Sequence, residues 1–329
     1  MLKHMRMRSA RVTVSDFLRR WAVQRQLGSL LNAWGDDLKI VRSLGGQARG
    51  TWLVRGTRQR FVLRTVGGEY EIMVLKHLAR RAWPYGAPLM LPAADGTMSK
   101  EAAGRLWTLY PFIDGVSAPA RKTPAQAAEL GHLVGSLDQL LAEVELPGAE
   151  FQLQLFTSPD PGLCTSPSLS EGERAIVRSA QAWLETKRDS AAAALAEMPT
   201  QTVHNDLHDN NLLFEGERLV GLIDFDSLAT APRVVDLQNA LLFLLAEPAN
   251  REEEIVTPLA QAYRKELPVT ESELQIVPVL LVDRLLSTIS QILAERPLKL
   301  HRRAAVSRYS ETLSWLLPRS SWLTSVLTR

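Results

Sequence analysis

Two patterns of apolar residues divide the chain. Short apolar runs bounded by glycine-containing turns predict strands at 38–44, 51–54, 60–66 and 105–110. Before the last of these, apolar residues at helical spacing predict a helix over 69–82, with Ile72, Leu75, Leu78 and Ala82 on its buried face. The first part of the chain is therefore expected to form an antiparallel sheet with one helix.

Helical periodicity dominates the rest of the chain. It predicts helices at 124–144, 171–198, 234–246, 251–266, 271–295 and 300–317. Segment 147–170, which contains Cys164, is rich in Pro, Ser and Gly and predicts a surface loop.

The first thirty residues are basic, with Asp16 as their single acidic side chain. Two interpretations are open. The segment is either an organellar targeting sequence or an amphipathic helix that Ser15 and Asp16 cap. Its low serine content favours the helix, packed on the sheet.

Polar residues gather around a short apolar hairpin. Two apolar runs, 212–214 and 219–225, flank the turn-like Glu215-Gly216-Glu217 and predict two paired strands. Pairing would bring Asp224 beside Asn211, and Asp206 lies on the loop that leads into the first strand. A few hard oxygens of this kind suit Mg²⁺, which keeps several waters and binds substrate phosphates.

Composition narrows the class of protein. The chain has 329 residues, 46% hydrophobic and 22% charged, as in folded globular domains. A formal net charge of +2 gives no support for a nucleic-acid partner, and the single cysteine excludes an intrachain disulfide and a cysteine-rich metal site. The longest uncharged apolar stretches, 237–246 and 274–282, are shorter than the ~18 residues of a membrane span. We therefore expect a cytoplasmic protein without a membrane partner.

The pattern His204-x-Asp206-x-x-x-x-Asn211, followed by Ile223-Asp224-Phe225 after the hairpin, resembles the catalytic core of the protein-kinase-like fold. Protein kinases have His-Arg-Asp-x-x-x-x-Asn and Asp-Phe-Gly at these places. The version here, with Asp-Leu-His before the asparagine and Ile-Asp-Phe-Asp later, is similar to the group of aminoglycoside phosphotransferases, choline kinases and type II homoserine kinases. The resemblance covers residues 38–246.

The resemblance implies roles by position. Asp206 would be the catalytic base that orients or deprotonates the attacking hydroxyl, and Asn211 and Asp224 would be metal ligands. His208 stands where protein kinases place a lysine near the γ-phosphate. A transition-state contact and a loop-stabilising role are both open for it.

Three neighbouring side chains would support the site. His204 is expected to hold the loop by bonding a backbone carbonyl. Asp226 would be a further carboxylate near the metal or a helix cap. Asp236 would tie down the catalytic loop from the helix that follows it.

The nucleotide contacts implied by the resemblance lie in the first part of the chain. Arg64 replaces the third-strand lysine of protein kinases, and its permanent charge suits phosphate binding, although a solvent-facing arginine is the alternative. Its helix partner is expected to be Glu71, or else Glu69. Segment 109–115 resembles the hinge whose backbone holds adenine, with Tyr110, Phe112 and Ile113 at the nucleotide.

We therefore expect an α+β, two-lobed protein-kinase-like fold. The small lobe would be 1–113, comprising a basic helical leader (1–35) and a sheet (36–113), and the helical lobe 114–329. The expected function is ATP- and Mg²⁺-dependent phosphoryl transfer to a hydroxyl of a small molecule. A homoserine-kinase-like amino-acid kinase and a non-catalytic nucleotide-binding protein are the alternatives. Aminoglycosides, amino acids, amino alcohols, sugars and proteins are all open as acceptors, and the sequence carries no signal for an oligomeric state.

Overall fold

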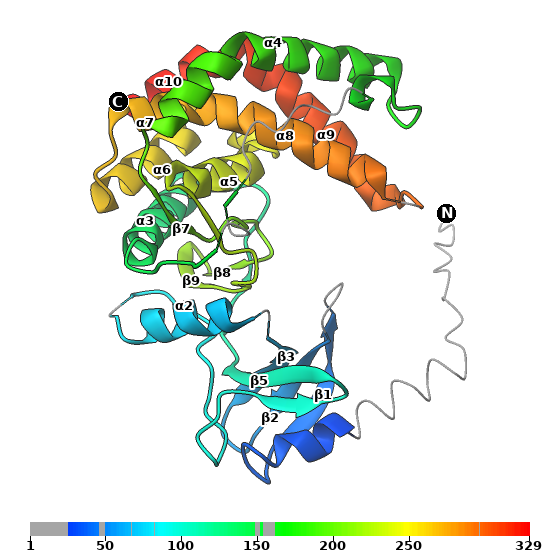
Figure 1. Cartoon of the computed structure of the whole chain (residues 1–329), viewed down its shortest axis with the longest axis vertical. Coiled ribbons are helices and arrows are strands. Elements are labelled where there is room, and N and C mark those ends of the chain that lie inside the picture. Colours follow the sequence, from blue (N-terminus) through cyan, green and yellow to red (C-terminus); the bar gives the residue numbers. More distant parts are fainter. Residues whose placement is uncertain are drawn as a thin grey trace, which may run out of the picture. The chain divides into compact units, whose positions relative to one another are not determined.

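The computed structural model describes residues 26–45, 50–66, 68–81, 83–148, 152–153, 162–295 and 297–329. These residues form two compact units (Figure 1). The first consists of the described parts of Met1–Ile72 and Pro88–Phe112, and the second of Met73–Ala87 and Ile113–Arg329. The predicted helix around Ser15 lies outside the described residues.

A five-stranded antiparallel sheet forms the first unit. Its strands run in the order β1 (Lys39–Gly45), β2 (Thr51–Arg55), β3 (Arg60–Thr65), β5 (Arg105–Pro111) and β4 (Lys100–Ala102). The sequence predicted four of these strands correctly and missed β4, which is three residues long. The predicted glycine turn at 45–50 falls largely outside the described residues.

Side chains of β3 alternate between the two faces of this sheet. Phe61, Leu63 and Thr65 are buried on one face, where Leu27 of the helical segment 26–31 joins their core cluster. Val62 and Arg64 occupy the other face, as the twofold repeat of a strand requires.

Helix α2 (Glu69–Ala79) begins in the first unit and continues into the second. Its buried apolar side chains, Val74, Leu75 and Leu78, include two of the four predicted core positions. The helix ends three residues before the predicted boundary at Ala82, which is not among the described residues.

Helices α3 (Pro124–Leu141) and α6 (Glu253–Glu266) pack closely in the second unit. Thr123 caps α3 by accepting a hydrogen bond from the Gln126 backbone, with Pro124 in the first turn. A Cβ atom added at Gly131 would lie only 2.2 Å from the carbonyl oxygen of Leu259. Glycine therefore permits the two helix backbones to approach each other.

The remaining helices follow the predicted order. They are α4 (Glu171–Ala196), α5 (Val234–Leu245), α7 (Glu271–Gln275), α8 (Val277–Ala294), α9 (Leu300–Leu316) and α10 (Ser320–Thr328). Helices α4, α8 and α9 pack side by side (Figure 1). The single helix predicted over 271–295 is wrong, because Pro278 cannot donate to the Leu274 carbonyl and the helix is interrupted before it. Helix α10 was not predicted from the sequence.

Two small sheets flank the loop that carries Asp206. Strand β7 (Thr200–Val203), which pairs with β10 (Ala229–Pro232), precedes the loop. The predicted hairpin follows it as β8 (Leu212–Glu215) and β9 (Arg218–Leu222), with β6 (Val116–Ser117) at its edge. Gly216 has φ +65° in the turn, a conformation that glycine adopts without strain.

One helical stretch in the described residues, Glu271–Ala294, is long and apolar enough to cross a membrane. Its most apolar 18-residue window has a mean hydropathy of 1.6, but 67% of that window is buried inside the protein. A buried core helix has the same composition, so this stretch is not evidence for a membrane span.

Candidate active site

The β8–β9 hairpin brings residues 211 and 224 together. Leu212 pairs with Leu222, and the backbone N–H of Ile223 donates to the Asn211 carbonyl at 2.9 Å. Asn211 and Asp224 therefore meet just beyond the paired part of the hairpin, as the sequence predicted.

Asn211 also holds the Asp206 carboxylate. Its side-chain Nδ2 donates to Oδ2 of Asp206 at 3.0 Å and to the Asp206 carbonyl at 3.0 Å. Both donations use the amide nitrogen, which leaves Oδ1 of Asn211 for another partner. Asn211 is buried and Asp206 is partly exposed, so the carboxylate is fixed in place and still accessible.

His208 adds a third group to this loop. Its Nε2 lies 3.5 Å from Oδ2 of Asp206, and its Nδ1 accepts the backbone N–H of Asn210. The ring packs edge-to-face on Phe243 of α5, with centroids 5.5 Å apart. The ring is thus oriented with one nitrogen towards the carboxylate.

Burial raises the pKa of the Asp206 carboxyl above its ordinary value. His208 and the Asn211 amide oppose this shift, whereas the negative charges of Asp224 and Asp226 reinforce it. Three carboxylates therefore lie within electrostatic reach of one another, and a cation bound among them would relieve their repulsion.

Two residues of the site adopt left-handed backbone conformations. Asn205 has φ +62° and Asp224 has φ +71°. Such a conformation costs an L-residue with a Cβ roughly 1–2 kcal/mol, and strained residues of this kind are concentrated at functional sites.

A buried carboxylate anchors the catalytic loop. Asp236 of α5 accepts the backbone N–H groups of His204 and Asn205, each at 2.7 Å. This confirms the predicted tie between the loop and the following helix. Asp138 of α3, which was not predicted from the sequence, lies close enough to Asp236 to influence its pKa and accepts the Tyr263 hydroxyl at 3.1 Å.

His204 does not bond a backbone carbonyl, so that prediction is wrong. Its Nδ1 accepts the backbone N–H of Asp206 at 3.3 Å, and its buried Nε2 has no hydrogen-bond partner in the described part of the chain. The ring instead packs edge-to-face on Phe225, with centroids 4.7 Å apart. Burial lowers the pKa of His204 to about 3, so the ring is neutral and fills the core beneath the loop.

The first unit contains the predicted arginine–glutamate pair. Nη2 of Arg64 lies 2.6 Å from Oε1 of Glu71, and their side chains are 12% and 2% exposed. Glu71 was therefore the right choice over Glu69. The guanidinium also lies 5.7 Å from the ring centre of Tyr110, which pairs with Val62 on the same face of the sheet.

The predicted hinge begins where β5 ends. Tyr110 is buried, and the Phe112 ring lies 4.3 Å from the guanidinium carbon of Arg60. The backbone N–H of Phe112 donates to the Arg60 carbonyl, so this donor is already used within the sheet. Ile113 is the first residue of the next stretch of the second unit.

A cation that the sequence analysis missed lies near Asp206. The Arg284 guanidinium of α8 forms no hydrogen bond or ion pair within the described ranges, and burial lowers its pKa, while the charge of Asp206 opposes that effect. An arginine in an apolar helix is a weak sequence signal, because its position relative to a distant loop depends on tertiary packing.

No group of three or more His, Cys, Asp or Glu side chains among the described residues is arranged to hold a metal ion. Asn211 and Asp224 instead offer an amide and a carboxylate oxygen. This number is sufficient for Mg²⁺, which commonly takes its other ligands from water and substrate phosphates.

Three comparisons place the chain among known proteins. It is 29% identical over 275 residues to a homoserine kinase of Brucella canis, and the aligned region covers 78% of this chain and 79% of the relative. An aminopropanol kinase structure matches with a TM-score of 0.65 at 19% identity, covering 92% of this chain and 98% of the other. An amicoumacin kinase in complex with AMP-PNP and Ca²⁺ matches with a TM-score of 0.63 at 14% identity. This match covers 92% of this chain and 96% of the other.

The structural matches show the fold and confirm the prediction of a kinase-like α+β architecture. The model of the phosphotransferase enzyme family matches residues 39–273, which include the sheet, the catalytic loop and the hairpin. The predicted family resemblance and enzyme class are thereby confirmed: the chain belongs to the phosphotransferase enzyme family.

Proposed function

We propose that this protein transfers the γ-phosphoryl group of ATP, with Mg²⁺, to a hydroxyl group of a small molecule. The observation that carries the proposal is the Asp206 carboxylate, fixed by Asn211 and accompanied by Asp224 on one loop and hairpin. Family membership supports the reaction class. A cytoplasmic location and lobes divided near residue 113 belong to the same proposal.

Asp206 has the properties of the base. Its raised pKa favours proton uptake from an attacking hydroxyl, and Asn211 keeps its carboxylate oriented for that contact. His208, 3.5 Å from the same carboxylate, would contact the transferred phosphoryl group or steady the loop.

Asn211 and Asp224 would hold the metal through their side-chain oxygens. Bound Mg²⁺ would neutralise charge on the phosphates. Arg64, which pairs with Glu71, would bind phosphate through its guanidinium, and Tyr110, Phe112 and Ile113 would lie at the adenine end.

Product formation tests this proposal directly. Purified protein is incubated with ATP or GTP, Mg²⁺ and a panel of amino acids, amino alcohols, sugars and aminoglycosides, and phosphorylated products are detected by mass spectrometry. Asp206→Asn and Asp224→Ala should each lower turnover about 10³-fold, the scale of a lost base or electrostatic contact. Glu215→Gln, which alters an exposed carboxylate of the same hairpin, should leave turnover unchanged.

The proposal fails if both active-site variants turn over the acceptor like the parent protein. Nucleotide binding without any product across the panel would favour the alternative of a non-catalytic binding protein.

A homoserine-like amino acid is the second candidate acceptor. Curated relatives of this chain include homoserine kinases, and Arg284 provides a partly buried cation near Asp206 for an acceptor carboxylate. A polycationic aminoglycoside would be repelled by the same charge. Comparison of kcat/KM for homoserine and for aminoglycosides distinguishes the two candidates.

A further inference from the structure

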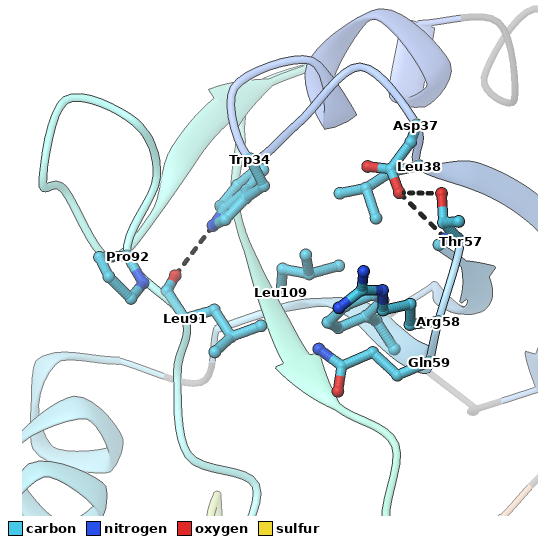
Figure 2. Close-up of a pocket in the computed structure, with 11 residues that line it drawn as sticks. Trp34, Asp37, Leu38, Thr57, Arg58, Gln59, Leu91, Pro92 and Leu109 are labelled. Atoms are coloured by element: carbon cyan, nitrogen blue, oxygen red, sulfur yellow. Dashed lines mark hydrogen bonds between the residues drawn. The ribbon is translucent and has the colours of Figure 1, made fainter.

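A pocket of about 560 Å³ opens on the sheet of the first unit (Figure 2). This volume is within the range of small-molecule sites. Four segments meet there: the stretch after helical residues 26–31, the β2–β3 turn with the start of β3, the stretch before β4, and strand β5. The lining residues are Trp34, Asp37, Leu38, Gly56, Thr57, Arg58, Gln59, Phe61, Leu91, Pro92 and Leu109.

The pocket lies on the opposite face of the sheet from Arg64. Phe61 and Leu109 line it, and the β3–β5 register pairs Leu63 with Leu109 and Arg64 with Thr108. Since successive residues of a strand point to opposite faces, Arg64 points away from the pocket. The pocket is therefore separate from the proposed phosphate contact.

The floor of the pocket is apolar and fixed in position. Trp34 donates its indole N–H to the Leu91 carbonyl at 2.8 Å, which satisfies its polar atom and orients the ring. Leu38 and Leu109 lie beside it (Figure 2), and Phe61 also lines the pocket. Such a surface gains free energy by burying an apolar group of a ligand.

The rim carries one negative and one positive charge. Oδ2 of Asp37 accepts both the backbone N–H and the hydroxyl of Thr57, at 2.9 and 2.8 Å. These bonds lower the pKa of Asp37, so it stays ionised, and its Oδ1 accepts no hydrogen bond from another described residue.

Arg58 follows Thr57 directly, so both charges belong to the same edge of the pocket. Neither the Arg58 guanidinium nor the Gln59 amide forms a hydrogen bond or ion pair within the described part of the chain. Figure 2 shows both side chains extending from the turn towards Leu109. The rim thus offers a cationic and an anionic group above an apolar floor.

We propose that this pocket binds an apolar α-amino acid in its zwitterionic form. The carboxylate pairs with Arg58, the ammonium group approaches Oδ1 of Asp37, and the aliphatic or aromatic side chain packs against Trp34 and Leu109. A hydrophobic amino acid is the small molecule that combines adjacent opposite charges with one apolar group. The site is additional to the phosphotransferase site.

Tryptophan indole resonances of the full-length protein provide the test. The chain has eight tryptophans, and Trp34→Phe identifies the Trp34 signal in a ¹H–¹⁵N spectrum. Titration with L-leucine or L-phenylalanine should shift that signal with a Kd on the order of 1 mM, as expected for a ligand of this size. Glycine, the N-acetyl derivative and the amide each lack one of the three recognition groups and should bind at least tenfold more weakly.

Two variants make the test specific. Arg58→Gln, at an exposed turn, should weaken binding at least tenfold, whereas Arg55→Gln, on the same hairpin but outside the pocket, should not. Asp206→Asn should retain the Trp34 shift, which separates this site from an amino-acid acceptor site. The proposal is overturned if the Trp34 signal does not respond, if glycine binds equally well, or if Arg58→Gln binds like the parent protein.

Discussion

Asp138 and Asp236 are two buried carboxyls whose substitution by asparagine should affect stability very differently. Burial and the neighbouring Asp236 raise the pKa of Asp138 well above its usual range. Because two adjacent buried carboxyls do not readily both ionise, we expect Asp138 to hold the proton of the pair. Burial raises the pKa of Asp236 to about 6, and at pH 7 it is therefore ionised. We expect Asp138 to donate this proton to Asp236, which accepts two backbone N–H groups of the catalytic loop.

The substitution Asp138→Asn preserves these hydrogen bonds. Its Nδ2 can donate to Asp236, and its Oδ1 can accept the Tyr263 hydroxyl as Asp138 does now at 3.1 Å. Asp138→Asn should therefore change the free energy of unfolding by no more than about 1 kcal/mol at pH 5. Asp236→Asn offers one oxygen to two donors. At pH 7, where Asp236 is ionised, this variant loses a charge-assisted bond and leaves one N–H unpaired, for a cost of about 3–5 kcal/mol.

The pH dependence of the free energy of unfolding gives a second, independent test of whether Asp138 holds a proton. The pKa of Asp138 is higher in the folded than in the unfolded chain, whose model value is 3.8. Its contribution to stability is complete below that value and declines as pH rises towards the folded pKa, by up to about 1.4 kcal/mol per pH unit. Asp138→Asn removes this decline, so the variant should gain stability relative to the parent between pH 5 and pH 8.

Urea unfolding followed by circular dichroism at pH 5, 7 and 8 measures both effects. Asp138→Leu, which leaves Asp236 and Tyr263 without their partner, should be destabilised by about 2 kcal/mol or more. The reasoning is refuted if Asp138→Asn is destabilised as much as Asp236→Asn, or if its stability follows the same pH dependence as that of the parent.

Three further predictions test packing, pairing and acceptor binding. Gly131→Ala should destabilise by about 1–3 kcal/mol in urea unfolding, because its Cβ would overlap the Leu259 carbonyl, whereas Gly172→Ala, with nothing within 4 Å, should not. Although burial favours the neutral acid, hydrogen bonds from an arginine and two serines lower the pKa of Glu173 to about 2. Its stabilisation, about 3 kcal/mol, is present above pH 4.5 and lost as pH falls towards 2, and Glu173→Gln should abolish this loss in acid titrations of stability. Arg284→Gln should raise KM for a carboxylate-bearing acceptor tenfold or more without lowering the unfolding midpoint, and an unchanged KM would contradict its role.

The local sequence was sufficient to predict the elements whose ends are marked by turn or capping residues. The hairpin around Gly216 and helix α3 behind Thr123 were predicted correctly, since turn and capping residues are readable from a few neighbours. The division between α7 and α8 was missed, although Pro278 is a local signal, because the apolar period continues through it. Strand β4 was too short to show any period.

The residues of the active site differ in the same way. Some can be found from the local sequence, and others only from the packing of distant helices. Asp206, Asn211 and Asp224 could be found because the hairpin between them is short and its register fixes their neighbours. Arg284 and Asp138 could not, since each reaches the loop only through helix packing. The incorrect prediction for His204 has a related cause: the sequence does not reveal that its ring lies in the core against Phe225.

The buried carboxyls explain how a strained loop keeps its shape. Asn205 has a left-handed backbone, yet its N–H donates to Asp236 at 2.7 Å, so a charge-assisted bond offsets the conformational cost at the same residue. Asp236 is in turn supported by Asp138, whose helix α3 packs closely against α6. The position of Asp206 therefore depends on the core of the second unit, and a core substitution such as Gly131→Ala should reduce turnover by displacing the loop even where the protein remains folded.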